Sequence, residues 1–310
     1  MVSRQRGLVA PIAGARRCWR AVGGQGVTGL LVFGQTGQVA RELQRLDSGA
    51  RFLSRAEADL TDPAACAAAI RAHAPCAVIN AAAYTAVDRA EGEEALATTI
   101  NGAAPAAMAA ACAGLGVPFV QISTDYVFDG SGETPWHVGD PVAPLNAYGR
   151  SKLVGEAGVR AAGGAYAVLR TSWVVSAHGS NFIKTMLRLG KERETLTIVA
   201  DQIGGPTPAA DIAAACVHMA KTLVSEPEKR GTYHFSGAPD VSWAGFAREI
   251  FAQAGINCAV RDIPTSTYPT PAARPLNSRL DCATLETVFG LSRPDWRRGL
   301  TDILKDLGET

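Results

Sequence analysis

Apolar and polar positions follow a strand-then-helix rhythm along the first half of the chain. Short apolar runs predict buried strands at 30–33, 50–54, 77–83, 117–122 and 166–173. Alanine-rich or amphipathic stretches between them predict helices at 63–72, 92–113 and 147–162. Strands that alternate with helices in this way are typical of a parallel sheet covered on both faces. We therefore predict an α/β fold built on a doubly wound parallel sheet.

The alternation loosens beyond Trp173. Helices are predicted at 181–189, 209–224 and 242–254 and near Trp296, and strands at 195–200 and 231–235. These pieces predict a second, smaller α/β domain. We expect the sheet domain to cover 29–172 and roughly 207–235, and the smaller substrate-binding domain to cover roughly 173–206 and 236–310.

Residues 1–28 stand apart from this pattern. They hold five arginines, no acidic residue and no apolar run long enough for a secretory signal. We expect a disordered extension or an over-long start, with a transit peptide as the less favoured alternative. Elsewhere we expect no stretch of the roughly 20 apolar residues that a membrane span needs.

Composition narrows the class of partner. The formal net charge of +1 and the lack of a basic stripe argue against nucleic acid. Seven scattered cysteines without a C-x-x-C pair favour a reducing, cytoplasmic location without structural zinc. Lone histidines such as His137 and His178 are expected to be surface or loop residues, because no second ligand stands at metal spacing.

A glycine turn follows the first strand. Gly34 and Gly37 are spaced so that the backbone can approach a pyrophosphate, and Ala40 takes the place of a third glycine. The helix that follows supplies N–H groups and a partial positive charge at its N-terminus. A plain turn is the alternative, but the strand–turn–helix context favours a dinucleotide cofactor in a Rossmann-type fold.

The second strand ends at Ser54 and Arg55, where an enzyme that uses NAD usually carries an acidic residue. An arginine there can neutralise the ribose 2′-phosphate of NADPH. A solvated surface Arg55 is nearly as good an explanation, so the preference for NADPH is a hypothesis.

Tyr148 and Lys152 stand four apart, on one face of the helix predicted at 147–162. A phenol has a pKa of about 10, and a nearby ammonium is expected to lower that pKa, so that the hydroxyl can exchange protons with a substrate oxygen. Ser123 and Thr124 add hydroxyls at a strand end. A lone Tyr-x-x-x-Lys match is common, and an ordinary exposed tyrosine is the alternative.

Taken in order, these motifs resemble the extended short-chain dehydrogenase/reductases. The resemblance is closer to the dTDP-4-dehydrorhamnose reductases over about residues 29–305, and it rests on the strings at 34–39, 80–88, 123–128, 148–152, 170–174, 181–187, 201–207 and 274–278. It implies reduction of the C4 keto group of dTDP-4-dehydro-β-L-rhamnose by NADPH, with NADH also accepted.

The resemblance also implies roles for single residues. Tyr148 would donate the proton, Lys152 would lower its pKa and hold the nicotinamide ribose, and Thr124 would bond the carbonyl oxygen. The expected cofactor contacts are Gly34, Thr36, Gly37, Gln38, Val39, Arg55, Asp59, Leu60, Ala82, Ala83, Tyr84, Ser123, Tyr148 and Lys152. The expected substrate contacts are Thr85, Val87, Thr124, Asp125, Tyr126, Trp173, Asn181 and Arg274.

One departure from the family pattern concerns metal. Some members join two chains through a magnesium ion held by glutamates, and Glu42 matches the first of these, but Ala210 stands at the second. We therefore expect no metal, and a monomer or homodimer. The alternatives are an enzyme acting on another nucleotide 4-keto sugar and a non-catalytic subunit, like the methionine adenosyltransferase β subunit that the family also resembles.

Overall fold

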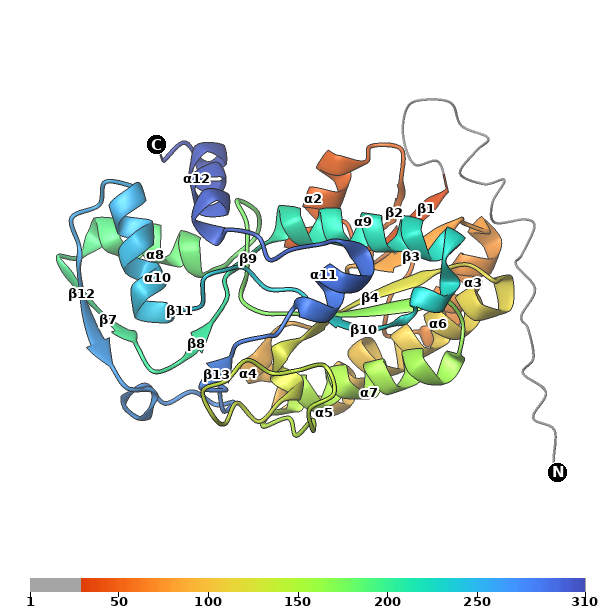
Figure 1. The fold of residues 1–310 in the computed structure, drawn as a ribbon, viewed down its shortest axis with the longest axis horizontal. Helices are drawn as coiled ribbons and strands as arrows, with labels where there is room; N and C mark the ends of the chain where they lie inside the picture. Colours follow the sequence, from red (N-terminus) through yellow and green to blue (C-terminus); the bar gives the residue numbers. More distant parts are fainter. Residues whose placement is uncertain (1–28, 310) are drawn as a thin grey trace.

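The computed structural model describes residues 29–309. Its centre is a six-stranded sheet in the order β10-β5-β4-β3-β1-β2, and every neighbouring pair in it is parallel (Figure 1). In chain order the strands are β1 (Leu30–Phe33), β2 (Arg51–Leu53), β3 (Ala77–Asn80), β4 (Phe119–Thr124), β5 (Tyr166–Thr171) and β10 (Gly231–His234). The predicted doubly wound, Rossmann-type sheet is confirmed.

Helices cover both faces of this sheet. Leu30 and Val32 of β1 point into one core, whereas Leu31 and Phe33 point into the other, as the two-residue period of a strand requires. The first core is covered by α2 (Gln38–Leu46), α9 (Ala209–Ser225) and α11 (Ala283–Phe289). The second is covered by α3 (Pro63–His73), α6 (Ala104–Leu115) and α7 (Ala147–Ala162). The sheet is therefore buried on both sides.

A separate core lies beside the sheet and defines what we call the second lobe. It is built from α8 (Phe182–Glu192), α10 (Trp243–Gln253), α12 (Trp296–Leu307) and the parallel pair β7 (Thr195–Val199) and β12 (Ala259–Ile263) (Figure 1). Short strands link it to the sheet: β6 (Val174–Val175), β8 (Ile203–Gly204), β9 (Thr207–Pro208), β11 (Val241–Ser242) and β13 (Asn277–Ser278). Leu285 and Phe289 of α11 pack on the large sheet although they lie within 236–310. The division into two domains stays a prediction.

The helix predicted at 92–113 is interrupted. It consists of α5 (Glu94–Thr98), a π-helical turn at Thr99–Ala103 and α6. By length and composition the whole stretch Glu94–Leu115 could cross a membrane, contrary to our expectation. Half of its apolar window is buried, and it packs against α3 and α7, which is what a core helix of a globular domain shows. The remaining short elements are α4 (Val87–Ala90), Asp125–Val127, Pro227–Lys229 and Thr265–Thr267.

Helix α7 has the predicted bounds and lies unusually close to its neighbours. Its N-cap, Asn146, accepts a hydrogen bond from the Gly149 amide at 2.8 Å. A Cβ on Gly149 would collide with the carbonyl oxygen of Tyr126, and one on Gly155 would collide with that of Asn101. Glycine at these two positions therefore lets α7 come close to Tyr126, which follows β4, and to Asn101 in the π-helical turn.

Candidate active site

A cleft of about 960 Å³ opens at the carboxyl ends of β1, β3, β4 and β5, facing the second lobe. Ligands bind at this edge in open parallel sheets. The structure brings most of the predicted site residues to its walls. These are Gly34, Thr36, Gly37, Gln38, Val39, Arg55, Asp59, Leu60, Ala82, Ala83, Thr85, Val87, Ser123, Thr124, Asp125, Tyr126, Tyr148, Lys152 and Trp173.

The glycine turn is shaped for close approach by a ligand. Gly34 has a φ of 105°, which favours glycine, and a Cβ there would be in van der Waals contact with Ala81 and Ala82 at 3.4 Å. Gly37 precedes α2 and offers no side-chain cap, and the first turn of α2 holds no acidic residue. The N-terminal N–H groups of α2 thus stay available to an anion such as a pyrophosphate.

Arg55 lies at the rim of the cleft, with 79% of its side chain exposed. Its Nε donates to the Asp59 carboxylate at 3.1 Å. The Thr61 amide and then Arg55 hold the pKa of Asp59 below its usual range. A 2′-phosphate would compete with Asp59 for this guanidinium, so recognition of NADPH through Arg55 stays a prediction.

Thr124 ends β4 on the floor of the cleft. Its hydroxyl donates to Asp125 Oδ1 at 3.0 Å and accepts from the Tyr126 amide at 3.2 Å. Asp125 is 3% exposed, and burial raises the pKa of its carboxyl to about 6. The Thr124 hydroxyl therefore sits between a carboxyl that titrates near neutrality and the open cleft.

Tyr148 and Lys152 both face this floor. Burial, and after it the Asp125 carboxyl, raises the pKa of Tyr148, while the Thr124 hydroxyl opposes the rise. Lys152 Nζ donates to the carbonyl oxygen of Ile122 at 2.6 Å. Burial lowers the pKa of Lys152 to about 8, against the opposing charge of Glu156. The net result is a raised pKa of Tyr148, because burial of the phenol dominates, and the lowering effect of Lys152 on that pKa stays a prediction.

A buried ion pair lies beneath the catalytic strand end. Glu156 accepts from Ser123 Oγ at 2.7 Å and from two nitrogens of Arg170 at 2.9 and 2.7 Å. Arg160 adds a contact at 3.1 Å. The Ser123 hydroxyl is thus committed to Glu156. Sequence analysis missed this role, although a glutamate four residues after Lys152 on one helix face was the signal that could have found it.

An aromatic pair closes one wall of the cleft. Trp173 has a φ of 47° and stacks on Trp243, with ring centroids 3.6 Å apart and an angle of 11° between the planes. Trp243 lines the cleft, and its Nε1 donates to Gln202 Oε1 at 3.1 Å. It was not among the predicted residues. Other lining residues that the sequence did not single out include Ala81, Gly179 and Ser180.

Three predicted residues do not line the cleft. The Tyr84 hydroxyl donates to Glu93 at 2.6 Å. Asn181 Nδ2 donates to Gln38 Oε1 at 2.8 Å, and Arg274 bonds the Asp88 carboxylate at 2.9 Å. Their side chains are directed at protein partners, so direct contact of these side chains with cofactor or substrate is not supported.

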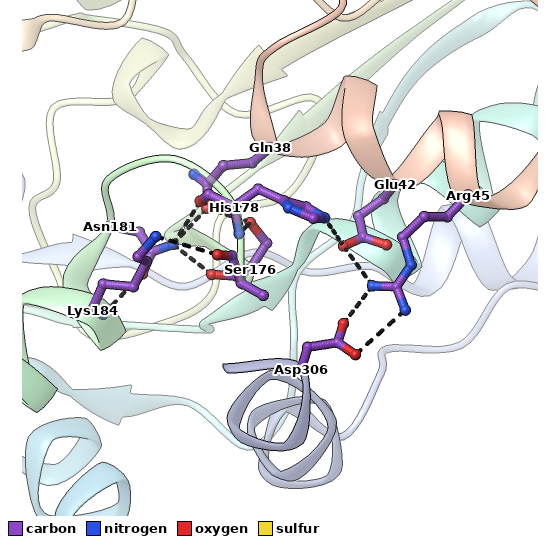
Figure 2. A network of polar contacts seen from close by, with 9 residues as sticks. Gln38, Glu42, Arg45, Ser176, His178, Asn181, Lys184 and Asp306 are labelled. Carbon is purple, nitrogen blue, oxygen red and sulfur yellow. Dashed lines mark hydrogen bonds and ion pairs between the residues drawn. The ribbon is translucent and has the colours of Figure 1, made fainter. Parts of the chain in front are cut away.

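The region around Glu42 bears on the question of metal. Glu42 lies 3.5 Å from Arg45 and 3.1 Å from His178 (Figure 2). It lines a second cavity, of about 510 Å³, together with Ala210 and Asp211. Asp211 thus lines the same cavity as Glu42. Within residues 29–309 no group of three or more histidines, cysteines or carboxylates is placed to hold a metal ion.

A parallel Rossmann sheet, a glycine turn and a Tyr-x-x-x-Lys helix on one cleft define an extended short-chain dehydrogenase/reductase. The chain belongs to the RmlD substrate binding domain family, whose model matches residues 28–309. It is similar to the dTDP-4-dehydrorhamnose reductases of Sinorhizobium fredii (44% identity, covering 86% of this chain and 93% of the relative) and Burkholderia thailandensis (45%, covering 90% and 98%).

Solved structures of dTDP-4-dehydrorhamnose reductases have the same fold as this chain. A dTDP-4-dehydrorhamnose reductase from Clostridium acetobutylicum superposes with a TM-score of 0.83 at 37% identity, covering 90% of this chain and 99% of the other. One from Bacillus anthracis, in complex with NADP, gives a TM-score of 0.83 at 35% identity and covers 89% and 98%.

Proposed function

We propose that the chain reduces the C4 keto group of dTDP-4-dehydro-β-L-rhamnose to give dTDP-L-rhamnose, the last step of dTDP-rhamnose biosynthesis. The observation that carries the proposal is the convergence of Thr124, Tyr148 and Lys152 on one cleft with the glycine turn. The curated relatives at 40–45% identity bear the name of this reductase.

The cofactor we propose is NADPH, with NADH also accepted. The fit is supported by the close approach that Gly34 permits, by the uncapped N-terminus of α2 and by Arg55 at the rim. A relative in complex with NADP supports the same choice. When bound, the reduced nicotinamide supplies the hydride.

Residues of the chain supply the proton that the substrate oxygen takes up. Tyr148 keeps its proton near neutrality because burial raises its pKa, so it is ready to donate to the substrate oxygen as negative charge develops there. Thr124 can turn its hydroxyl from Asp125 to the same oxygen and add a second hydrogen bond. Lys152, cationic below a pKa of about 8, supplies positive charge on the cofactor side.

On the substrate side, the proposal assigns the sugar and nucleotide to the wall formed by Thr85, Val87, Tyr126 and Trp173, which all line the cleft. We also propose that the enzyme works in the cytoplasm as a monomer or homodimer, without nucleic-acid or membrane partners. Its near-zero net charge supports the lack of a polyanionic partner.

The direct test is oxidation of NADPH and NADH, followed at 340 nm, with dTDP-4-dehydrorhamnose as substrate and a UDP-4-keto sugar as control. Turnover with the dTDP sugar alone is expected. Preferential turnover of the UDP sugar would assign a different substrate, and binding of either sugar nucleotide without oxidation of the cofactor would favour a non-catalytic subunit.

A further inference from the structure

Gln38, the first residue of α2, reaches out of the cofactor turn into the second lobe. Its Oε1 accepts hydrogen bonds from Ser176 Oγ at 2.9 Å and from Asn181 Nδ2 at 2.8 Å. Its Nε2 donates to the carbonyl oxygen of Val174 at 3.3 Å. Figure 2 shows the side chain of Gln38 directed at Ser176 and Asn181. All three partners lie in segment 174–181, which joins Trp173 to α8.

Segment 174–181 runs from Trp173, in the wall of the cleft, to the N-cap of α8. At one end it adjoins Trp173, whose φ of 47° is strained for a bulky residue and persists only where the surroundings hold it. At the other end Asn181 caps α8 by accepting from the Lys184 amide at 3.2 Å. Gly179 and Ser180, between these ends, line the cleft themselves.

Three of the four hydrogen bonds that the Gln38 side-chain amide can make go to this segment. Asn181 is committed in the same way, because its Nδ2 also donates to the Ser176 carbonyl at 2.7 Å. Glu42, farther along α2, also contacts this segment, through His178 at 3.1 Å. Gln38 adds three neutral hydrogen bonds, so α2 is linked to segment 174–181 through both Gln38 and Glu42.

We infer that Gln38 is a positioning residue that ties the cofactor turn to segment 174–181 and thereby holds Trp173 in its stack on Trp243. Asn181 acts within this link and does not touch the substrate diphosphate. The inference rests on the proposed function only for the identity of the nucleotide sugar. Its consequence is that a side chain in the cofactor turn controls affinity for the substrate.

The first experiment uses Gln38→Met, which keeps the length of the side chain and removes its hydrogen bonds. Two stacked indoles give an exciton couplet in far-ultraviolet circular dichroism, and its loss in Trp243→Phe identifies the signal. Gln38→Met is expected to weaken this couplet without any ligand present. Lys184→Met is the matched control, because it removes a bond from Lys184 Nζ to Ala177 at 3.3 Å in the same segment without reaching Gln38.

The second experiment measures the dissociation constant of dTDP by titration calorimetry. Gln38→Met is expected to raise it by about three- to tenfold, the size of effect seen among residues of one hydrogen-bond network. In turnover the same change should raise KM for the sugar nucleotide more than it lowers kcat. Asn181→Asp keeps the cap of α8 but loses the donor, and it should give a similar rise.

A double-mutant cycle decides whether the two residues act together. If they share one link, Gln38→Met/Asn181→Asp binds dTDP no more weakly than the worse single variant. Additive losses, or an unchanged couplet and unchanged dTDP affinity in Gln38→Met, would overturn the inference. Ser176→Ala, which removes one bond to Gln38 together with the contacts of Ser176 Oγ to the His178 backbone, replaces Gln38→Met if that variant does not fold. The couplet needs neither ligand nor turnover, so the inference can stand or fall separately from the proposed reaction.

Discussion

The surroundings of Tyr148 favour its protonated form, as its proposed role of proton donor requires. Burial and the Asp125 carboxyl both raise its pKa. A general acid placed in this way contributes about 10²–10⁴-fold to a rate. We expect Tyr148→Phe to lower kcat by that factor while the dissociation constant of NADPH, from fluorescence titration, stays nearly constant. Turnover close to that of the unchanged enzyme would remove Tyr148 from the mechanism.

Lys152 is expected to make cofactor binding depend on pH. Its pKa is about 8, below the usual value of about 10.4, because burial disfavours the charged form. The cation is therefore lost as the pH rises through 8. Affinity for NADPH is expected to fall between pH 7 and 9, whereas Lys152→Met should bind weakly and show a flat profile. The same slope in both proteins would assign the pH dependence to another group.

At the scale of single elements, α7 depends on two glycines for its position. A Cβ on Gly155 would meet the Asn101 carbonyl oxygen, which belongs to a helical backbone and cannot move aside. Gly155→Ala is expected to lower the free energy of unfolding by about 1–3 kcal/mol, as overpacking does. Gly114→Ala in α6 is the control, since its Cβ meets nothing and should be neutral or slightly stabilising. Equal urea midpoints for the two variants would contradict this account of α7.

The sequence predicts well those elements that have a strong hydrophobic period or clear residues at their start and end. The bounds of β1 and α7 match the expectation, and those of α9 differ by one residue. The two-residue strands β6, β8, β9, β11 and β13 carry no period that a pattern could reveal. The π-helical turn was also missed, because its five residues, Thr99–Ala103, lie between helical stretches and include no proline that would mark a break.

Site residues could be predicted where a single sequence motif fixes their positions relative to one another. The glycine turn and the Tyr148–Lys152 spacing are local, and both reach the cleft. Trp243 was missed because it meets Trp173 only through the packing of the second lobe. Arg274 and Asn181 were misplaced because distant partners, Asp88 and Gln38, set the direction of their side chains. In each of these cases tertiary contacts, which the sequence pattern does not reveal, set the position of the side chain.

For the whole molecule, we expect activity and association to be independent of divalent metal. Magnesium wants about six oxygens in near-octahedral geometry. In the cavity beside α2, Glu42 is already engaged by Arg45 and His178, and Lys305 lines the same space. EDTA should therefore change neither turnover nor the mass measured by analytical ultracentrifugation. A shift from dimer to monomer on chelation would contradict this and would point to Asp211 as the second ligand.

The strand order of the large sheet has a consequence for synthesis on the ribosome. The edge strand β10 and the covering helices α9 and α11 come from residues that emerge after the chain has already entered the second lobe. A nascent chain that ends before Gly231 therefore exposes the open edge of β5, and one apolar face lacks part of its cover. We expect arrested chains of that length to be cleaved by protease within β4 and β5 and to recruit chaperones, whereas chains extended past Phe289 resist cleavage. Equal resistance at both lengths would show that the first five strands fold without their late-arriving partners.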